Sequence, residues 1–404
     1  MKVIGDLHIH SRFARATSKD LNIFNLEKWA RIKGVNLLGT GDFTHPEWNA
    51  ELKRDLQEDE TGILKTKTGF PFVLQTEVSL MYSQDGKGRR IHLVLLAPSF
   101  EIVDQIIDYF GKKGRLDYDG RPIFGLNAIE VTESLKSISD EIEIIPAHIW
   151  TPWFGLLGSK SGFNSFEQAF QDQVKHIYAL ETGLSSDPPM NWRLSSLDRF
   201  SILSFSDLHS FWPWRIGRES TLFDLEKLNY KSILNAIRIQ KGLVGTIEVK
   251  PDYGKYHFDG HRFCKFSCSP TESKKRNNKC PVCGKSLTIG VLNRVEELAD
   301  RQENYIKKDA KEYHELLPLH ELISLVLNSS IATKKVWEIY NPLISKFGNE
   351  FEILMNTPFE ELEKATNEKI AKIIIRNRLG KMKVKPGFDG EYGQAMLEEQ
   401  KTLF

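Results

Sequence analysis

The feature that most constrains the fold of this chain is an alternation of short apolar runs and helical patterns from Met1 to about residue 220. The apolar runs are rich in Ile, Leu and Val, as parallel strands covered on both faces tend to be. After an initial run at Val3 and Ile4, they span residues 35–40, 72–76, 91–97, 142–147, 177–180 and 201–205. Helical patterns lie between them at residues 24–33, 101–110, 128–137 and 165–174. This order predicts a parallel sheet or a (βα) barrel.

Histidine, aspartate and glutamate residues stand at the ends of these predicted strands. The pairs His8–His10 and Asp207–His209 have the i, i+2 spacing that points both side chains to one face of an extended chain. One such residue alone is often a hydrogen-bonding residue or a helix cap. Because active sites lie at the carboxyl ends of strands in such folds, the joint pattern predicts a multinuclear zinc or manganese site. The other members of the set are Asp42, His45, Glu77, His92, His148 and Glu181.

These residues resemble the motifs of the PHP (polymerase and histidinol phosphatase) superfamily over residues 1–220. The resemblance implies an α/β fold, a distorted (βα)7 barrel, with two or three divalent metals (zinc, magnesium or manganese) that hydrolyse phosphoesters. It implies one metal held by His8, His10, Glu77 and Asp207. It implies a second held by Glu77, His92 and His148, and catalytic roles for Glu77, Asp207, His209 and Asp42.

A third metal, served by His209, is where the sequence departs from the superfamily. Phe43 replaces a usual ligand, and Arg15 stands about where another ligand is often histidine. His45 is a candidate substitute, and Asp42 precedes it in the same loop. Two metals are therefore better supported by the sequence than three.

All four cysteines lie within residues 264–283, as Cys264-x3-Cys268 and Cys280-x2-Cys283. Two close pairs predict a closed, tetrahedral four-cysteine zinc site that stabilises a segment too small to bury its own core. The alternative, a pair of disulfides, is disfavoured in a reducing interior. Nearby cations can contact phosphates or form a solvated loop; they are Lys274, Lys275, Arg276, Lys279 and Lys285.

The chain after the cysteines is expected to be largely helical, from Leu316 to Arg378, with an irregular tail up to Gln394. We expect three units: residues 1–220 as the barrel, 221–302 as the zinc-binding domain and 303–404 as a helical region. The helical region faintly resembles a helix-hairpin-helix DNA-binding unit without its glycines. The last residues, Gln400 to Phe404, resemble the front half of a peptide that binds a PCNA-type sliding clamp.

Composition limits the classes of partner. The formal net charge is +1, so any surface for nucleic acid must be local. No run of about 18 apolar residues and no signal-peptide pattern is present, which predicts a cytoplasmic, nucleoid-associated protein without membrane contact.

The combination of barrel, zinc module and helical region resembles the endonuclease Q family of archaea and some bacteria. Four motifs carry the resemblance: Gly5-Asp6-Leu7-His8-Ile9-His10-Ser11, Thr40-Gly41-Asp42-Phe43-Thr44-His45-Pro46, Pro146-Ala147-His148-Ile149-Trp150-Thr151-Pro152-Trp153 and Phe205-Ser206-Asp207-Leu208-His209-Ser210. The resemblance implies a repair enzyme that nicks damaged DNA 5′ of deaminated bases (uracil, hypoxanthine, xanthine) and of abasic sites.

A flipped lesion requires flat apolar walls and polar edges beside the metals. The tryptophans among the candidates have an alternative role as caps of the barrel core. The candidate contacts to DNA are Trp150, Trp153, Phe154, Lys160, Asn191, Arg193, Trp212, Trp214 and Arg218. Alternative functions are a PHP phosphatase acting on a small phosphomonoester, a PHP exonuclease and a non-enzymatic DNA-binding adaptor.

Overall fold

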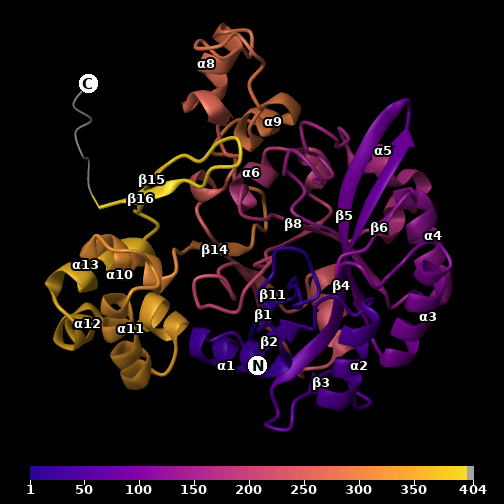
Figure 1. The fold of residues 1–404 in the computed structure, drawn as a ribbon, viewed down its shortest axis with the longest axis horizontal. Coiled ribbons are helices and arrows are strands. Elements are labelled where there is room, and N and C mark those ends of the chain that lie inside the picture. Colours follow the sequence, from indigo (N-terminus) through magenta and orange to yellow (C-terminus); the bar gives the residue numbers. More distant parts are fainter. Residues whose placement is uncertain (398–404) are drawn as a thin grey trace.

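A curled, mixed sheet forms the centre of the computed structural model, which describes residues 1–397 (Figure 1). Two short strands, β3 (Leu64–Lys65) and β6 (Ile123–Phe124), pair with β4 at its side. The main path runs β14 (Glu312–Glu315), β11 (Leu243–Glu248), β10 (Ser220–Asp224), β1 (Lys2–Asp6), β2 (Leu37–Gly39), β4 (Pro71–Gln84), β5 (Lys87–Ala97) and β7 (Glu143–Pro146).

Two further strands bring this sheet round to its start. β8 (Ala179–Glu181) contacts β7 and pairs in parallel with β9 (Ser201–Leu203). The chain after β9 returns to the chain after β1 through a parallel bridge between Leu208 and Ile9. The strands β1, β2, β4, β5, β7, β8 and β9 therefore surround one core, which confirms the distorted barrel.

The longest strands depart from the parallel arrangement that their apolar runs predict. β4 and β5 form an antiparallel hairpin, and β5 also pairs antiparallel with β7. The hairpin turns at Asp85-Gly86, where both residues have positive φ, 53° and 70°. An Asp-Gly pair between apolar runs is the usual sequence of such a turn. That dipeptide was the available indication that residues 72–97 form a hairpin.

Most of the helices that cover the barrel begin at side-chain caps, α2 being an exception. Asn22, Ser99, Asn127, Ser165 and Asn229 each accept a hydrogen bond from a backbone amide in the first turn of their helix. Among the helices over the barrel, α2 and α6 were not predicted, although a proline opens each of them. The helices over the barrel are α1 (Ile23–Lys33), α2 (Pro46–Asp55), α3 (Phe100–Gly111), α4 (Ala128–Ile138), α5 (Phe166–Phe170), α6 (Pro188–Trp192) and α7 (Tyr230–Ile239).

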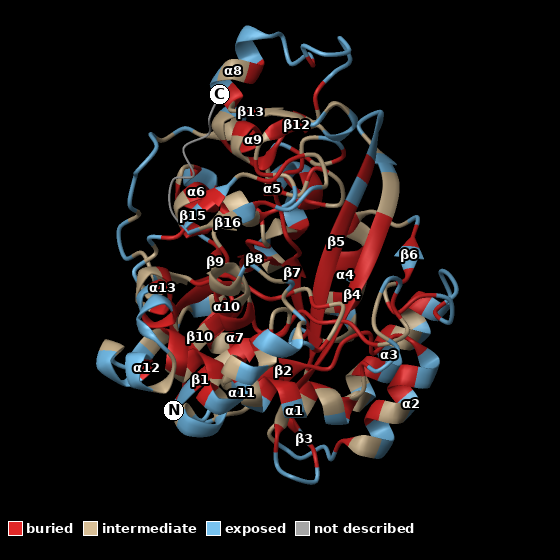
Figure 2. Cartoon of the chain, turned by 60° about the vertical axis from the view of Figure 1, so that its left-hand side comes forward, coloured by how far each residue is buried: buried red, intermediate tan, exposed pale blue. Residues whose placement is uncertain are grey.

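The expected boundary at residue 220 does not divide the sheet. β10 and β11 lie beyond it, yet they continue the sheet from β1, and β14 pairs in parallel with β11. The segment that projects from the barrel is smaller, as the group around α8 in Figures 1 and 2 shows. It contains β12 (Asp259–His261), β13 (Phe266–Cys268), α8 (Pro270–Lys275) and α9 (Val291–Leu298).

The C-terminal part is helical, as its pattern predicts. Lys33 on α1 joins it to the barrel: its Nζ lies 2.6 Å from Oε1 of Glu350, and both side chains are buried. The tail after residue 380 is not wholly irregular, because β15 (Lys383–Lys385) and β16 (Gln394–Met396) pair antiparallel. The predicted sliding-clamp peptide lies outside the described residues. The helices are α10 (Leu319–Leu327), α11 (Lys334–Phe347), α12 (Phe359–Ala365) and α13 (Glu368–Arg378).

Burial marks the barrel as the main core of the molecule. Figure 2 shows β4 and β5 buried along most of their length. Within residues 1–397, no helix has both the length and the apolar character needed to cross a membrane.

Candidate metal centre

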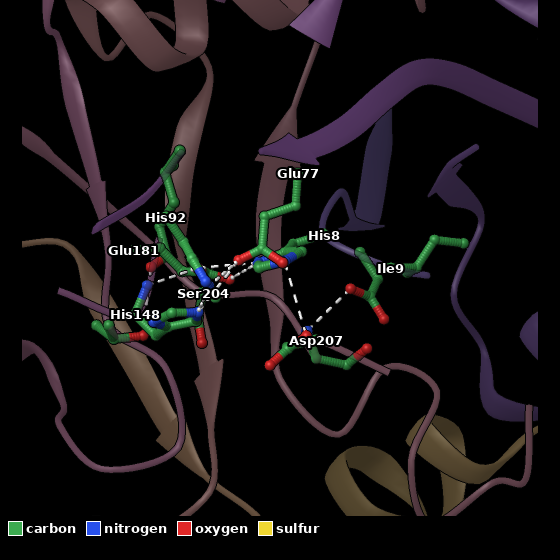
Figure 3. Close-up of polar contacts among 12 residues, drawn as sticks. His8, Ile9, Glu77, His92, His148, Glu181, Ser204 and Asp207 are labelled. Carbon is green, nitrogen blue, oxygen red and sulfur yellow. Dashed lines mark hydrogen bonds and ion pairs between the residues drawn. The ribbon is translucent and has the colours of Figure 1, made fainter. Parts of the chain in front are cut away.

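Four of the predicted ligands meet at the end of the barrel, as Figure 3 shows in part. His8 and His10 follow β1, Glu77 lies within β4, and Asp207 follows β9. One ligand atom from each lies within 4.8 Å of the others. His10 Nε2 is 3.2 Å from Glu77 Oε2 and 3.1 Å from Asp207 Oδ1. This is the first predicted ligand set, although Glu77 sits in the middle of a long strand rather than at its end.

A second group shares Glu77. Its other oxygen, Oε1, lies 2.7 Å from His92 Nδ1 and 3.3 Å from His148 Nε2. The ligand atoms of these three residues also lie within 4.8 Å of one another. Because the two carboxylate oxygens of Glu77 face different groups, the side chain is placed to bridge two cations.

The polar atoms that point into the first group fit a cation. His8 Nε2, His10 Nε2 and Asp207 Oδ1 are all buried without a hydrogen-bond partner. A buried polar atom without a partner costs free energy, so three converging ones indicate a ligand. Nitrogen and carboxylate oxygen donors are suited to zinc or manganese.

Two carboxylates behind the histidines fix which ring nitrogen faces inward. Glu181 Oε1 lies 2.9 Å from His8 Nδ1, and Asp42 Oδ1 lies 2.9 Å from His10 Nδ1. Each imidazole donates from Nδ1 and keeps Nε2 for a metal, the usual arrangement around metal-ligating histidines. Asp42 was predicted as a ligand and catalytic group. In the structure Asp42 supports His10 and lies outside both ligand groups, so its roles as a ligand and a catalytic group stay predictions.

The charges of the site agree with this assignment. Burial raises the pKa of Glu77, but the histidines and Arg121 outweigh burial and hold that pKa well below its usual range. Arg121 Nη1 lies 3.0 Å from Glu77 Oε2. Burial lowers the pKa of His92 to about 4, so this imidazole is neutral at pH 7. The ionised Glu77 carboxylate and the neutral His92 imidazole are both in the protonation state that binds a cation.

The pKa of His8 moves in the opposite direction. Burial by itself lowers it, but the carboxylates of Glu181 and Glu77 raise it well above the ordinary value. In the same way, Asp42 raises the pKa of His10 against the effect of burial. A metal must therefore displace protons from these rings, and metal binding is expected to weaken as the pH falls.

The residues predicted to bind a third metal do not form a ligand group with one another in the structure. His45 precedes α2, and its ring stacks on Phe13 at a centroid distance of 4.3 Å. His209 Nδ1 lies 3.0 Å from the carbonyl oxygen of Asp207. Within residues 1–397, neither residue falls in the candidate ligand groups, so their role as ligands of a third metal stays a prediction.

The backbone is strained at three residues of the site. Asp42, His148 and Asp207 have positive φ values of 38°, 30° and 47°. Such angles are uncommon for residues other than glycine and concentrate at functional sites. Gly183 packs below His148: a Cβ on this glycine would lie 2.4 Å from His148 Cβ. Only glycine therefore permits this placement of the ligand.

A cavity of about 490 Å³ opens above the metal ligands. Its floor contains His148, Asp207 and His209. Its walls carry three cations and two tyrosine rings, contributed by Arg215, Arg218, Lys255, Tyr256 and Tyr392. Lys255 Nζ lies 4.6 Å from the ring centroid of Tyr392. None of the three cations has an ion pair with a carboxylate of residues 1–397.

Most of these wall residues were missed by reasoning from the sequence. Only Arg218 was predicted, and it is held at 7% exposure by its hydrogen bonds to the carbonyl oxygen of Ser206. Arg215 follows the Trp-Pro loop after His209, so its position in the sequence was an available indication. Nothing in the local sequence marks Tyr392, which is 185 positions from Asp207.

Two predicted DNA contacts form a buried pair instead. Trp150 Nε1 donates to Asn191 Oδ1 at 2.8 Å, and both side chains are almost fully buried. This corrects their prediction as DNA contacts, because neither can reach a ligand. Phe154 packs against His92 with ring centroids 4.4 Å apart. Trp153 packs against Tyr256 at 5.7 Å, near the cavity.

The remaining predicted contacts lie away from the metal ligands. Trp212 and Trp214 stack at 5.4 Å in an aromatic cluster with Trp29 and Trp337. Lys160 lines a different cavity, beside Arg89 and Arg90. Arg193 accepts hydrogen bonds at its carbonyl oxygen from the amides of Asp300 and Arg301.

The projecting segment holds a second kind of metal group. His261, Cys264, Cys280 and Cys283 place one ligand atom each within 4.8 Å of the others. His261 Nδ1 lies 3.4 Å from Cys283 Sγ. Cys268, the fourth predicted ligand, is outside this group and is buried in a small core with Cys280 and Leu287. The structure thus adds His261 to the predicted cysteines as a candidate ligand, and the four-cysteine set stays a prediction.

Comparison with known proteins gives matches by sequence and by structure. A family model described as the MJ0043 C-terminal domain matches residues 318–381, the region of α10 to α13. The chain is 34% identical over 294 residues to the uncharacterized protein MJ0043 of Methanocaldococcus jannaschii, covering 72% of this chain. It spans only 36% of the length of that relative.

Two solved structures match nearly the whole chain. The crystal structure of the lesion-specific endonuclease PfuEndoQ from Pyrococcus furiosus is 32% identical, with a TM-score of 0.88. The match covers 99% of this chain and 96% of PfuEndoQ. Endonuclease Q in complex with a 27-mer duplex substrate, with an abasic lesion at the active site, is also 32% identical. Its TM-score is 0.89, and the match covers 99% of this chain and 98% of that protein.

Proposed function

The chain belongs to the endonuclease Q family, and from this premise we propose that it is a metal-dependent endonuclease of DNA repair. It hydrolyses the phosphodiester on the 5′ side of deaminated bases (uracil, hypoxanthine, xanthine) and abasic sites. The observation that carries the proposal is the cavity above the Glu77-bridged ligand groups. It joins the ligands to three cations that have no ion pair with a carboxylate of the described chain.

The catalytic part of the proposal assigns roles to residues of this chain. His8, His10, Glu77 and Asp207 would hold one divalent cation, and Glu77, His92 and His148 would hold the other. When bound, two such cations would favour formation of hydroxide at neutral pH and would offset the charge of the reacting phosphate. Arg121 keeps Glu77 ionised. His209 uses Nδ1 for the Asp207 carbonyl, which leaves Nε2 to exchange a proton with the substrate.

The cavity suits an extruded nucleotide. Its volume of about 490 Å³ falls in the usual range of small-ligand sites, roughly 300–1,000 Å³. Arg215, Arg218 and Lys255 are placed to bind phosphate oxygens, and Tyr256 and Tyr392 offer flat faces for a base. Flipping a base is least costly at a lesion, which favours damaged sites over intact pairs.

The metals expected in the barrel are zinc, magnesium or manganese, and the Cys/His group of the projecting segment is expected to hold zinc. The sliding-clamp peptide stays a prediction for Gln400 to Phe404.

A nicking assay tests the proposal. Identical end-labelled duplexes carry uracil, hypoxanthine, xanthine, an abasic site or no lesion, with added Mn²⁺, Mg²⁺ or Zn²⁺. We expect one nick 5′ of each lesion, no cleavage of the intact duplex, loss of cleavage with EDTA and recovery with metal. Asp207→Asn should be inactive, while Asp140→Asn, an exposed aspartate on a turn, should match the wild type.

Two results contradict the proposal. A ladder of products from the labelled end indicates an exonuclease. Hydrolysis of a small phosphomonoester without any nick at a lesion indicates a phosphatase of the PHP type.

A further inference from the structure

The projecting segment exposes apolar side chains on its metal-ligand turns. Phe263 is 83% exposed, the highest value among the large apolar side chains of residues 1–397. It lies between the ligands His261 and Cys264, in a short 3-10 turn. Val282, between the ligands Cys280 and Cys283, is 68% exposed. Each of the two ligand turns therefore presents one apolar side chain to solvent.

The same segment is strongly basic. Residues 262–285 contain seven lysines and arginines and one glutamate, a formal excess of six positive charges in a chain whose net charge is +1. Arg262 lies over the ring of Phe263, with Cζ 5.3 Å from the ring centroid. Lys265 and Lys285 are exposed next to the ligand turns. Apolar tips within a basic field fit the stacked bases and phosphates of DNA.

The segment is fixed to the loops of the metal centre. Lys255 and Tyr256, which line the cavity, come just before β12. On the other side, Arg294 of α9 donates to the carbonyl oxygens of Leu157 and Phe163, in the loop that follows His148. The segment therefore stands at a set position relative to the metal ligands of the barrel, and Figure 1 shows it projecting from the barrel.

We propose that residues 259–288 form a DNA-inserting tip, in which Phe263 enters the base stack beside the lesion while the surrounding cations bind phosphates. The inference rests on the proposed function, because it requires a DNA substrate. A metal held by His261 and Cys264 would stiffen the turn that carries Phe263, and a stiff apolar wedge can unstack a base step and bend the duplex. This opening helps a lesion to leave the helix.

The test compares Phe263→Ala with Phe24→Ala in the full-length protein. Phe24 on α1 is a matched control, 73% exposed and outside the segment. Binding to a duplex with one abasic site is measured by anisotropy over a range of KCl concentrations. A 2-aminopurine next to the lesion reports unstacking, and zinc content shows that the module is intact.

We expect Phe263→Ala to lose about 10-fold in affinity and most of the 2-aminopurine signal, at an unchanged salt slope and zinc content. Phe24→Ala should match the wild type. Lys265→Gln with Lys285→Gln should instead reduce the salt slope, by about 0.9 for each lost phosphate contact.

Wild-type affinity and unstacking in Phe263→Ala would overturn the inference. The inference would also be overturned if Phe263→Ala bound DNA like the wild type but lost binding to anionic phospholipid vesicles, because the tip would then be a membrane contact. The two proposals can fail separately. If the wild type unstacks the lesion but does not nick it, the inserting tip is supported and the nuclease function is contradicted. If Phe263→Ala nicks the lesion at the wild-type rate without unstacking it, the nuclease function is supported and the role of the tip in opening the lesion is contradicted.

Discussion

The two metal-binding regions of this molecule are built in opposite ways. The barrel centre takes its ligands from five strands or the residues after them (β1, β4, β5, β7 and β9), and His8, His10 and Glu77 are fully buried. The Cys/His group takes four ligands from residues 261–283, and Cys283 is exposed. One site is assembled by the fold, and the other is local.

This difference indicates which of the two regions depends on a metal for its stability. The elements that carry the barrel ligands pack on a large apolar core. Because this core stabilises the barrel by itself, the barrel should fold without a metal. The core beneath the Cys/His group consists of Cys268, Cys280 and Leu287. So small a core contributes little stability, and binding free energy must replace it.

The largest effect is expected from Glu77→Gln. It removes a ligand from both barrel groups, so nicking should fall by more than about 10³-fold while the Tm changes little. Nicking and calorimetry on the same preparation measure both quantities. If Glu77→Gln kept both its activity and its full metal content, Glu77 could not be the ligand shared by the two groups.

The next test sharpens the ligand set of the local site. His261→Ala should weaken zinc binding by about 100-fold or more and unfold residues 259–288 locally, since one of four ligands is lost. Cys268→Ala should keep the zinc, at a small cost in packing. Zinc titration and hydrogen exchange check this pair; the reverse result would restore the four-cysteine site.

Smaller effects are expected when the carboxylates that hydrogen-bond to His8 and His10 are removed. Glu181→Gln and Asp42→Asn each leave the ligands in place but remove the group that orients His8 or His10. Metal affinity of the barrel should fall about 10- to 100-fold. Glu248→Gln is a matched control, a buried carboxylate that accepts hydrogen bonds from Thr182 and Ser204 rather than from a ligand. Equal losses in all three variants would contradict the assigned roles.

The smallest effect concerns pH. Burial raises the pKa of Glu248 to about 8, from an ordinary value near 4.5 in the unfolded chain. The contribution of this group to stability is therefore complete below about pH 4.5 and is lost as the pH rises through about 8. The slope should not exceed about 1.4 kcal/mol per pH unit.

Glu248→Gln should flatten this dependence, because glutamine stays neutral. Urea unfolding of both proteins between pH 5 and 8.5 measures the difference. Parallel curves would show that Glu248 is ionised in the folded state, like Glu77.

Much of the fold and the site followed from local pattern. The apolar runs at residues 35–40, 91–97, 142–147 and 201–205 match strands, because burial on both faces leaves a long apolar run in the sequence. The ligand residues followed from the chemistry of imidazole and carboxylate at those strand ends. Strand direction did not follow: β4 and β5 are antiparallel, and an apolar run looks the same in either direction.

Residue type and spacing identified the barrel side chains that can bind metals, although Glu77 and His92 lie within β4 and β5 rather than at strand ends. The tertiary structure adds that Glu77 faces two groups, that Asp42 supports His10, and that His261 lies among the cysteines as a candidate ligand. It also brought Tyr392 to the cavity above Asp207. The reason is physical: residue type and spacing set local chemistry, whereas sheet register and chain packing set the distances between remote atoms.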